Sequence, residues 1–250
     1  MRAGDVPRKQ AARLPAGRKS PASGKWFGVE AHRRLREMYA TLLAAYGPRH
    51  WWPADSPFEV VLGAVLTQGT SWRGVEKSIA SLRAEGLLTV DGIRGVSEDR
   101  LRQAIRPSGF VVRKAACIQA FVRLLDGAYD GSLERMARQP ASTVRRQLLA
   151  IRGIGPETAD AILLYALGHP VFVVDEYFRR VATRHELLDA NVRYAELQKL
   201  GDLAVASGTA AETAQHANEL HALIVEVGKR HCGVSPRCEQ CPLQPYLPVD

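Results

Sequence analysis

Apolar residues recur at helical spacing along most of the chain after Trp26. The segments that this spacing predicts as helices are the series Leu35, Met38, Leu42 and Tyr46, the almost wholly apolar segment 57–68, the series Val75, Ile79 and Leu82, the amphipathic segment 113–126 and the segment 211–230. The run 171–174 is the only strand-like stretch, and it is too short to found a sheet. The pattern therefore predicts an all-α fold.

Three serines stand where helix N-caps are expected, at Ser97, Ser132 and Ser142. Their hydroxyl groups can accept hydrogen bonds from backbone N–H groups of a first helical turn. The acids Glu98 and Asp99 follow Ser97 in the turn where negative charge is favourable. We expect helices to begin at all three serines.

Composition and charge narrow the class of protein. With 250 residues, 46% of them hydrophobic, the chain can bury the core of one large domain or two small ones. The formal net charge of +8 and the isoelectric point of about 9.6 favour a polyanionic partner, although a basic protein without one has the same charge. No apolar run could span a bilayer or serve as a secretory signal, so we expect no membrane partner and a cytoplasmic location. We interpret residues 1–25 as a disordered basic tail.

The segment 148–168 holds a Gly-x-Gly turn between two helical patterns. Gly153 and Gly155 can adopt backbone angles that β-branched residues avoid, and Pro156 suits the first turn of the next helix. The predicted product is a tight hairpin whose backbone N–H groups, at a helix N-terminus that includes Thr158, hold a phosphate without reading a base. The alternative is an ordinary turn between packed helices.

This segment resembles the helix-hairpin-helix of the endonuclease III superfamily of DNA glycosylases. In that family a short connection leads from the hairpin to a catalytic Asp, and here it leads to a Val-Val-Asp sequence that ends at Asp175. The resemblance implies a helical barrel over 56–167, a second helical domain of 26–55 and 168–250, and a cleft between them. It also implies a monomer that binds double-stranded DNA containing a damaged base.

Two carboxylates are candidates for the chemistry. Asp175 starts a helix, where backbone N–H bonds fix a carboxylate in space, and a plain N-cap is the alternative. The resemblance makes Asp175 the residue that stabilises positive charge on the deoxyribose as the N-glycosidic bond breaks. Bifunctional relatives carry a Lys where this chain has Glu157, and a carboxylate cannot form a Schiff base. We therefore expect base removal without strand cleavage, with Glu157 either a second catalytic acid or a first-turn helix acid.

Three of the four tryptophans lie close together, in His50-Trp51-Trp52-Pro53 and at Trp72. A flipped base needs aromatic faces to replace its lost stacking, and Trp has the best face for a cationic alkylated purine. The stretch is similar to the 3-methyladenine DNA glycosylase III branch of the superfamily. That similarity implies a base pocket of Trp51, Trp52, Pro53 and Trp72, with the base between Trp51 and Trp72. Core packing is the alternative for Trp52.

The loop before Trp72 departs from that branch, because Gly69 replaces the Asn of its Leu-Thr-Gln-Asn-Thr sequence. In the family this loop approaches the DNA near the lesion. We therefore expect the strand-plugging residue or the base preference to differ here. Gln68 is retained, and we expect its side chain to fill the gap that the flipped base leaves.

Three of the four cysteines, Cys232, Cys238 and Cys241, cluster near the C-terminus, and Cys117 lies far away. In a reducing compartment such clustering favours a metal site over disulfides. The spacing resembles the C-terminal iron–sulfur loop of endonuclease III. The resemblance implies a [4Fe–4S] cluster with three Cys ligands.

The fourth cysteine of the family is replaced by Leu247. The fourth ligand would then be water or Asp250, and the alternatives are a zinc site completed by His231 or a loop without metal. The expected role of a cluster is structural. The basic residues that it would hold against DNA phosphates are Lys229, Arg230 and Arg237.

These patterns and resemblances predict a monofunctional base-excision-repair DNA glycosylase that flips alkylated purines such as 3-methyladenine and hydrolyses their N-glycosidic bond. The second hypothesis is an endonuclease III-like glycosylase for oxidised, deaminated or mismatched bases. A third, of another class, is a non-catalytic DNA-binding or redox-sensing iron–sulfur protein. Asp175 disfavours the third hypothesis, because DNA binding alone does not require that carboxylate.

Overall fold

The computed structural model describes residues 29–49, 51 and 54–248. Within these ranges the chain is helical and has no β-strand, so the predicted all-α fold is confirmed. The α-helices are α1 (Val29–Tyr46), α2 (Pro57–Leu66), α3 (Trp72–Ala84), α4 (Val90–Gly95), α5 (Glu98–Ala104), α6 (Val111–Tyr129), α7 (Leu133–Ala137), α8 (Ala141–Ala150), α9 (Pro156–Ala161), α10 (Glu176–Arg184), α11 (Tyr194–Val205) and α12 (Ala210–Arg230). The shorter elements are the 3-10 helices η1 (Arg106–Ser108) and η3 (Gln244–Tyr246) and the π-helical segment η2 (Ile162–Ala166).

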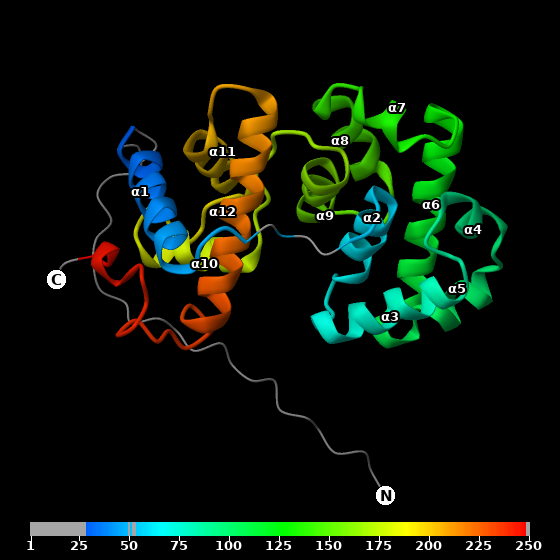
Figure 1. Ribbon diagram of the computed structural model, residues 1–250, viewed down its shortest axis with the longest axis horizontal. Coiled ribbons are helices and arrows are strands. Elements are labelled where there is room, and N and C mark those ends of the chain that lie inside the picture. The colour runs from blue at the N-terminus through cyan, green and yellow to red at the C-terminus, as the bar shows by residue number, and fades with distance from the viewer. Residues whose placement is uncertain (1–28, 50, 52–53, 249–250) are drawn as a thin grey trace, which may run out of the picture.

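The helices form two groups that lie side by side (Figure 1). In one group α1 packs against α11 and α12, and α10 packs against α12. In the other group α2 packs against α3, α6 and α9, and α8 packs against α9. The groups meet where α12 contacts η2. The division into folding units at 26–55, 56–167 and 168–250 stays a prediction.

Helix α2 is buried from Phe58 to Leu66. Its one charged residue, Glu59, accepts hydrogen bonds from Arg83 Nη2 at 2.8 and 2.9 Å, which satisfies the buried carboxylate. Ser56 caps the helix by accepting from the Glu59 N–H at 3.2 Å. Although α2 is strongly apolar, the described part of the chain has no helix that is both long and apolar enough to cross a membrane.

Two of the three predicted serine caps are confirmed. Ser97 Oγ accepts from the Arg100 N–H at 3.3 Å, and Ser132 Oγ accepts from the Arg135 N–H at 3.2 Å. The prediction for Ser142 is wrong, because α8 begins at Ala141 with Pro140 as its N-cap. Pro140 is held near its usual φ with an extended ψ of 134°, so the helix starts directly after it and Ser142 falls inside the first turn.

The chain between α9 and α10 changes conformation twice. In η2 the Leu167 N–H donates to Ile162 O at 3.1 Å, the i to i+5 bond of a π-helix, which turns the following side chains relative to an α-helix. The run of residues 169–175 then has no regular secondary structure, and the Val171 N–H donates to His169 O at 2.9 Å. The Phe172 N–H donates to Asp202 Oδ1 at 2.8 Å and anchors this run to α11. The run delivers Asp175 to the start of α10.

Candidate functional site

Asp175 is the N-cap of α10, as the sequence predicts. Its Oδ1 accepts a hydrogen bond from the Phe178 N–H at 2.7 Å. Its Oδ2 lies 3.6 Å from Nε2 of His221, and only 14% of the Asp175 side chain is exposed. One carboxylate oxygen is therefore held by the helix end, and the other faces a histidine from α12.

The His221 imidazole is buried and oriented by Tyr165 of η2, whose hydroxyl is hydrogen-bonded to Nδ1. Burial, with the nearby charge of Asp175, raises the pKa of Tyr165 well above its ordinary value, so the phenol stays protonated and donates this bond. A neutral imidazole then carries its proton on Nε2, which has no hydrogen-bond partner among the described residues. A water molecule or a bound ligand can satisfy such a buried polar atom.

Trp51 lies against His221, with ring centroids 5.5 Å apart and planes inclined by 37°. It meets the Tyr165 ring edge-on at 6.4 Å, and Nζ of Lys229 lies 6.0 Å from its centroid. A cavity of about 300 Å³ opens at this point, and Trp51, Tyr165 and Asn218 line it. The structure thus places the first predicted pocket residue beside the Asp175–His221 pair.

Trp72 lies at the start of α3 and lines a second cavity, of about 480 Å³. Ala54 and Asp55 line both this cavity and that of Trp51. The two tryptophans therefore belong to neighbouring cavities, and their enclosure of one base stays a prediction. Three further residues of the predicted pocket segment lie outside the described part of the chain, and they are His50, Trp52 and Pro53.

Glu157 stands in the first turn of α9. Its side chain is exposed, yet the protein around it and the negative charge of Asp175 raise its pKa above the ordinary value. The charge of Asp175 therefore acts on Glu157, while a catalytic role for the two acids stays a prediction.

The hairpin before α9 needs glycine at only one of its two predicted positions. Gly153 has a φ of +103°, and a Cβ built on it would lie 3.6 Å from Cβ of Cys117. Gly155 is the N-cap of α9 with φ −95° and ψ 178°, which is extended backbone that any residue adopts. The expected need for unusual angles at Gly155 is therefore wrong. What its missing side chain leaves is open space in front of α9, because nothing lies within 4 Å of a Cβ built there.

Gln68 is bonded to this hairpin. Its Nε2 donates to Gly153 O at 2.8 Å and to Thr158 Oγ1 at 3.0 Å. Thr158 is itself buried. In the structure both residues brace the hairpin from within, and the DNA contacts that the sequence predicts for Gln68 and Thr158 stay predictions.

The loop after α2 is held by a buried lysine that no motif in the sequence marks. Nζ of Lys114 donates to Leu66 O at 2.8 Å, to Thr70 Oγ1 at 2.7 Å and to Ser108 O at 2.7 Å. Burial lowers the pKa of Lys114 to about 8. Three acceptors thus satisfy the ammonium group and tie two loops together.

Phe110 is an exposed aromatic residue of these paired loops. It is 64% exposed and has a left-handed backbone with φ +47°. A Cβ built on Gly69 would lie 3.4 Å from the Phe110 ring, and the guanidinium of Arg113 lies 5.5 Å from the ring centroid. The predicted DNA-contacting residue Gly69 therefore lies beside a protruding aromatic ring.

The three basic residues predicted to hold phosphates are exposed but differ in their surroundings. Arg230 pairs with Glu226 at 2.5 Å and lies over the Tyr46 ring at 5.2 Å. Arg237 donates from Nη2 to Arg230 O at 2.7 Å. Lys229 lies instead over the pocket tryptophan, so its charge acts at the candidate site.

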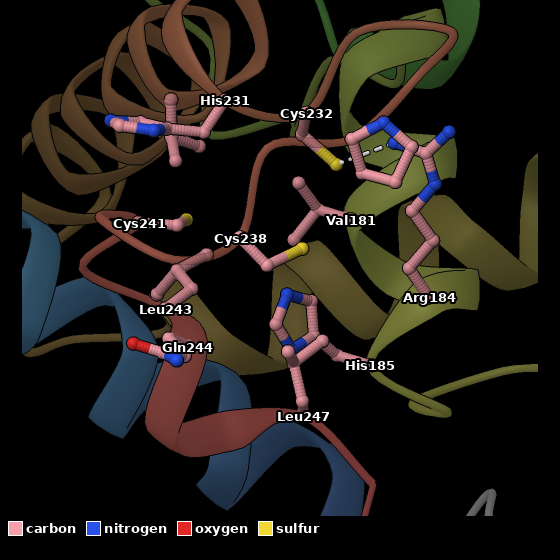
Figure 2. A pocket seen from close by; sticks show the side chains of 12 residues that line it. Val181, Arg184, His185, His231, Cys232, Cys238, Cys241, Leu243, Gln244 and Leu247 are labelled. Carbon is pink, nitrogen blue, oxygen red and sulfur yellow. Dashed lines mark hydrogen bonds between the residues drawn. The ribbon is translucent and has the colours of Figure 1, made fainter.

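The three clustered cysteines line one cavity of about 230 Å³ near the C-terminal end of α10 (Figure 2). Cys232, Cys238 and Cys241 are free thiols, and Nη1 of Arg184 donates to Sγ of Cys232 at 3.1 Å. Leu247 lines the same cavity. Within the described ranges no three His, Cys, Asp or Glu side chains form a group that could hold a single metal ion.

His221 is the main residue of the site that sequence reasoning missed. Its signal is its position within the segment 211–230, where it shares the buried part of the helix with Leu220 and Ile224. A titratable side chain on such a face needs a polar partner. The partners, Tyr165 and Asp175, come from elements far away in the sequence.

Residues 62–204 match the model of the HhH-GPD superfamily base excision DNA repair proteins. The chain is 39% identical over 214 residues to a provisionally named DNA repair glycosylase of Methanocaldococcus jannaschii. That alignment covers 85% of this chain and 94% of the relative.

Solved structures share the fold. The 3-methyladenine DNA glycosylase MagIII of H. pylori, bound to 1,N6-ethenoadenine, superposes with a TM-score of 0.68 at 28% identity. The match covers 81% of this chain and 98% of that one. A non-covalent complex of endonuclease III with DNA gives a TM-score of 0.71 over 86% and 94% of the two chains, and its 24% identity supports the fold alone.

Proposed function

Because the chain belongs to the HhH-GPD superfamily of base excision DNA repair proteins, we propose that it is a monofunctional DNA glycosylase that removes alkylated purines from double-stranded DNA. Membership of this superfamily and the similarity to its glycosylases identify the chain as a DNA repair glycosylase. This agrees with the resemblance found in the sequence. The class of damaged base and the absence of strand cleavage are the parts that we propose.

The observation that carries the proposal is the position of Asp175 beside the Trp51 cavity. His221 joins them, since it lies 3.6 Å from the carboxylate and 5.5 Å, between ring centroids, from the indole. A base rotated out of the duplex can stack on Trp51 while its sugar meets Asp175. The carboxylate charge then opposes the cation that forms on the sugar as the glycosidic bond breaks.

Monofunctionality is supported by Glu157. Its carboxyl group stands at the sequence position where bifunctional relatives carry the attacking lysine, and the charge of Asp175 acts on it. Without an amine at that position the nucleophile is water, which Asp175 can orient or deprotonate. The product is an intact abasic site.

Double-stranded DNA is the partner that the surface supports. A Cβ built on Gly155, the N-cap of α9, meets nothing within 4 Å, and this open space could admit a phosphate oxygen near a helix N-terminus. The net charge of +8 adds general attraction to a polyanion. A purine substrate is supported by the similarity to MagIII of H. pylori, whose structure contains 1,N6-ethenoadenine. The two chains are 28% identical.

A [4Fe–4S] cluster fits the donors around the cysteine cavity better than zinc. The ligands of one zinc ion must converge to about 2.0–2.3 Å from a single atom, whereas the thiolates of a cluster bind different irons. Cys232, Cys238 and Cys241 are spread around a cavity of about 230 Å³, without a group suited to a single ion. These three residues would hold the cluster, which supplies a rigid cross-link between the C-terminal loop and the helices beneath it. Cys117 is buried beside the hairpin and takes no part.

The test is release of free bases from a panel of duplexes that each carry one lesion, with the iron content measured on the same sample. We expect the largest rate with 3-methyladenine or another alkylated purine, and about four irons per chain in a yellow-brown protein. Activity confined to oxidised pyrimidines or mismatched adenine would overturn the substrate assignment. Folded, active protein without iron would overturn the cluster.

Lys229 favours a second candidate within the same family, a glycosylase for uncharged damaged bases. Its ammonium group already lies 6.0 Å from the centroid of the Trp51 ring, so a positively charged purine stacked there would meet a like charge. Under this alternative, neutral lesions such as hypoxanthine are released faster than 3-methyladenine. Lys229→Ala would then raise the rate on the cationic base and leave the neutral one less affected.

A further inference from the structure

The cysteine cavity contains three thiols but lacks a fourth cysteine. Leu247, at the position of the fourth family cysteine, lines the cavity with a hydrocarbon side chain that cannot bind iron. A [4Fe–4S] cluster presents four irons, and an iron without a protein ligand is the one most easily lost. A fourth protein ligand must therefore come from another residue of the cavity wall.

His185 provides such a donor directly after α10. It is 4% exposed and lines the cavity together with Cys232, Cys238 and Cys241. Its Nδ1 lies 3.0 Å from Tyr246 O. Because a carbonyl oxygen only accepts hydrogen bonds, Nδ1 carries the proton, and Nε2 of the neutral ring keeps its lone pair.

The orientation of the ring agrees with ligation. Figure 2 shows the His185 ring between Leu247 and Cys238, with one nitrogen directed toward the cysteine side of the cavity. A metal-bound histidine commonly donates its other N–H to a backbone carbonyl, and the bond to Tyr246 O is of this kind. The His231 ring, by contrast, points away from the sulfur atoms of Cys232 and Cys238 (Figure 2).

We propose that Nε2 of His185 is the fourth ligand of a [4Fe–4S] cluster held by Cys232, Cys238 and Cys241, an inference that rests on the cluster of the proposed function. The chain thereby replaces the missing thiolate with an imidazole from a different element. Arg184, the neighbouring residue, donates a hydrogen bond to Cys232 Sγ, so the C-terminal end of α10 contacts the cluster site twice. Asp250 lies outside the described residues.

The test compares the full-length protein with His185→Ala, His185→Cys and the matched control His231→Ala, which removes the other histidine of the cavity wall. Each protein is labelled with 15N-histidine and its cluster is reduced. Pulsed electron paramagnetic resonance then measures the coupling between the cluster spin and nitrogen. Iron per chain and conversion to a three-iron cluster on mild oxidation are measured in parallel.

We expect a strong histidine nitrogen coupling in the wild type and in His231→Ala, and its loss in both His185 variants. His185→Ala should convert to the three-iron form at least tenfold faster than wild type, and His185→Cys should restore four irons. The Cys variant keeps the inference testable if the Ala variant loses its cluster. A four-iron wild type without nitrogen coupling would overturn the His185 inference alone, and an iron-free wild type would overturn it together with the cluster.

Discussion

Nε2 of His221 lies 3.6 Å from Oδ2 of Asp175, just beyond hydrogen-bonding distance. The Tyr165 hydroxyl holds the opposite nitrogen of the same ring. The imidazole is therefore held by the phenol through one nitrogen and faces the carboxylate with the other. A substrate or water that draws the two groups together by a few tenths of an ångström completes a hydrogen bond only in the occupied site.

Asp175→Asn should lower base release by about 10²–10³-fold, because it removes the charge that opposes the sugar cation. The fold should be retained, since Asn is as good an N-cap as Asp and can still accept from the Phe178 N–H. Single-turnover base release and duplex affinity check this prediction. Near-normal turnover by the variant would show that Asp175 is only a helix cap.

His221→Phe should lower base release by about 10–100-fold, because the phenyl ring keeps the packing on Trp51 but cannot donate to Asp175. The matched control is His216→Phe, on the same helix, where the histidine is hydrogen-bonded to Tyr39 at 3.1 Å. The control should retain its rate. Equal losses in the two variants would indicate a general effect on α12 rather than a role at the site.

Monofunctionality predicts that the abasic product nicks only after alkali or an abasic endonuclease is added. Borohydride should trap little covalent complex, because Glu157 cannot form an imine. Complex trapped at the rate of base loss would contradict this interpretation of Glu157. If the Lys229→Ala variant no longer formed this trapped complex, the lysine beside Trp51 would be identified as the nucleophile.

Gly228→Ala should destabilise the protein by about 1–3 kcal/mol, because its Cβ would lie 2.2 Å from the Tyr177 ring, where α10 packs on α12. Gly127→Ala is the matched control in α6. Nothing lies within 4 Å of a Cβ there, so this exposed helical position should gain about 0.5–1 kcal/mol. Chemical denaturation measures both free energies of unfolding, and a stable Gly228→Ala would contradict the tight helix contact.

Asp202 should make stability fall as pH rises from about 4 to 6. Burial raises the pKa of Asp202 to about 6. The hydrogen bond from the Phe172 N–H and the charge of Arg145 lower this pKa, whereas the charge of Asp160 raises it further. The folded state therefore binds more protons than the unfolded state in this window, and raising the pH removes stability. Asp202→Asn, which keeps an oxygen for Phe172, should flatten this part of the profile. An unchanged slope would contradict the assignment.

The parts of the site that depend on local sequence could be predicted. Asp175 caps a helix because it follows an apolar run and precedes helix-forming residues, and this relationship is contained in neighbouring positions. The segment 211–230 likewise matches α12 within one residue. Cys232, Cys238 and Cys241, which lie close together in the sequence, also line one cavity in the structure, and their role as cluster ligands stays a prediction.

The parts that depend on tertiary packing could not be predicted. Tyr165 and His221 are 56 positions apart in the sequence. Their hydrogen bond forms because α12 contacts the π-helical segment η2, which the spacing of apolar residues does not predict. The Gln68 amide donates to two acceptors on a hairpin far away in the sequence, and neighbouring positions do not reveal these bonds. The prediction that Ser142 caps a helix is wrong for a local reason, because Pro140 is the N-cap and the helix begins before Ser142.

Helix α10 has nine residues, about 14 Å in length, and it carries Asp175 at one end and Arg184 at the other. A rigid helix couples the ligands at its two ends, and such coupling is reciprocal. If iron steadies the helix in the position that suits the damaged nucleotide, a tightly bound abasic-site analogue must slow iron loss to a chelator by a corresponding factor. Occupancy of the DNA site and retention of the metal then become two measures of a single equilibrium.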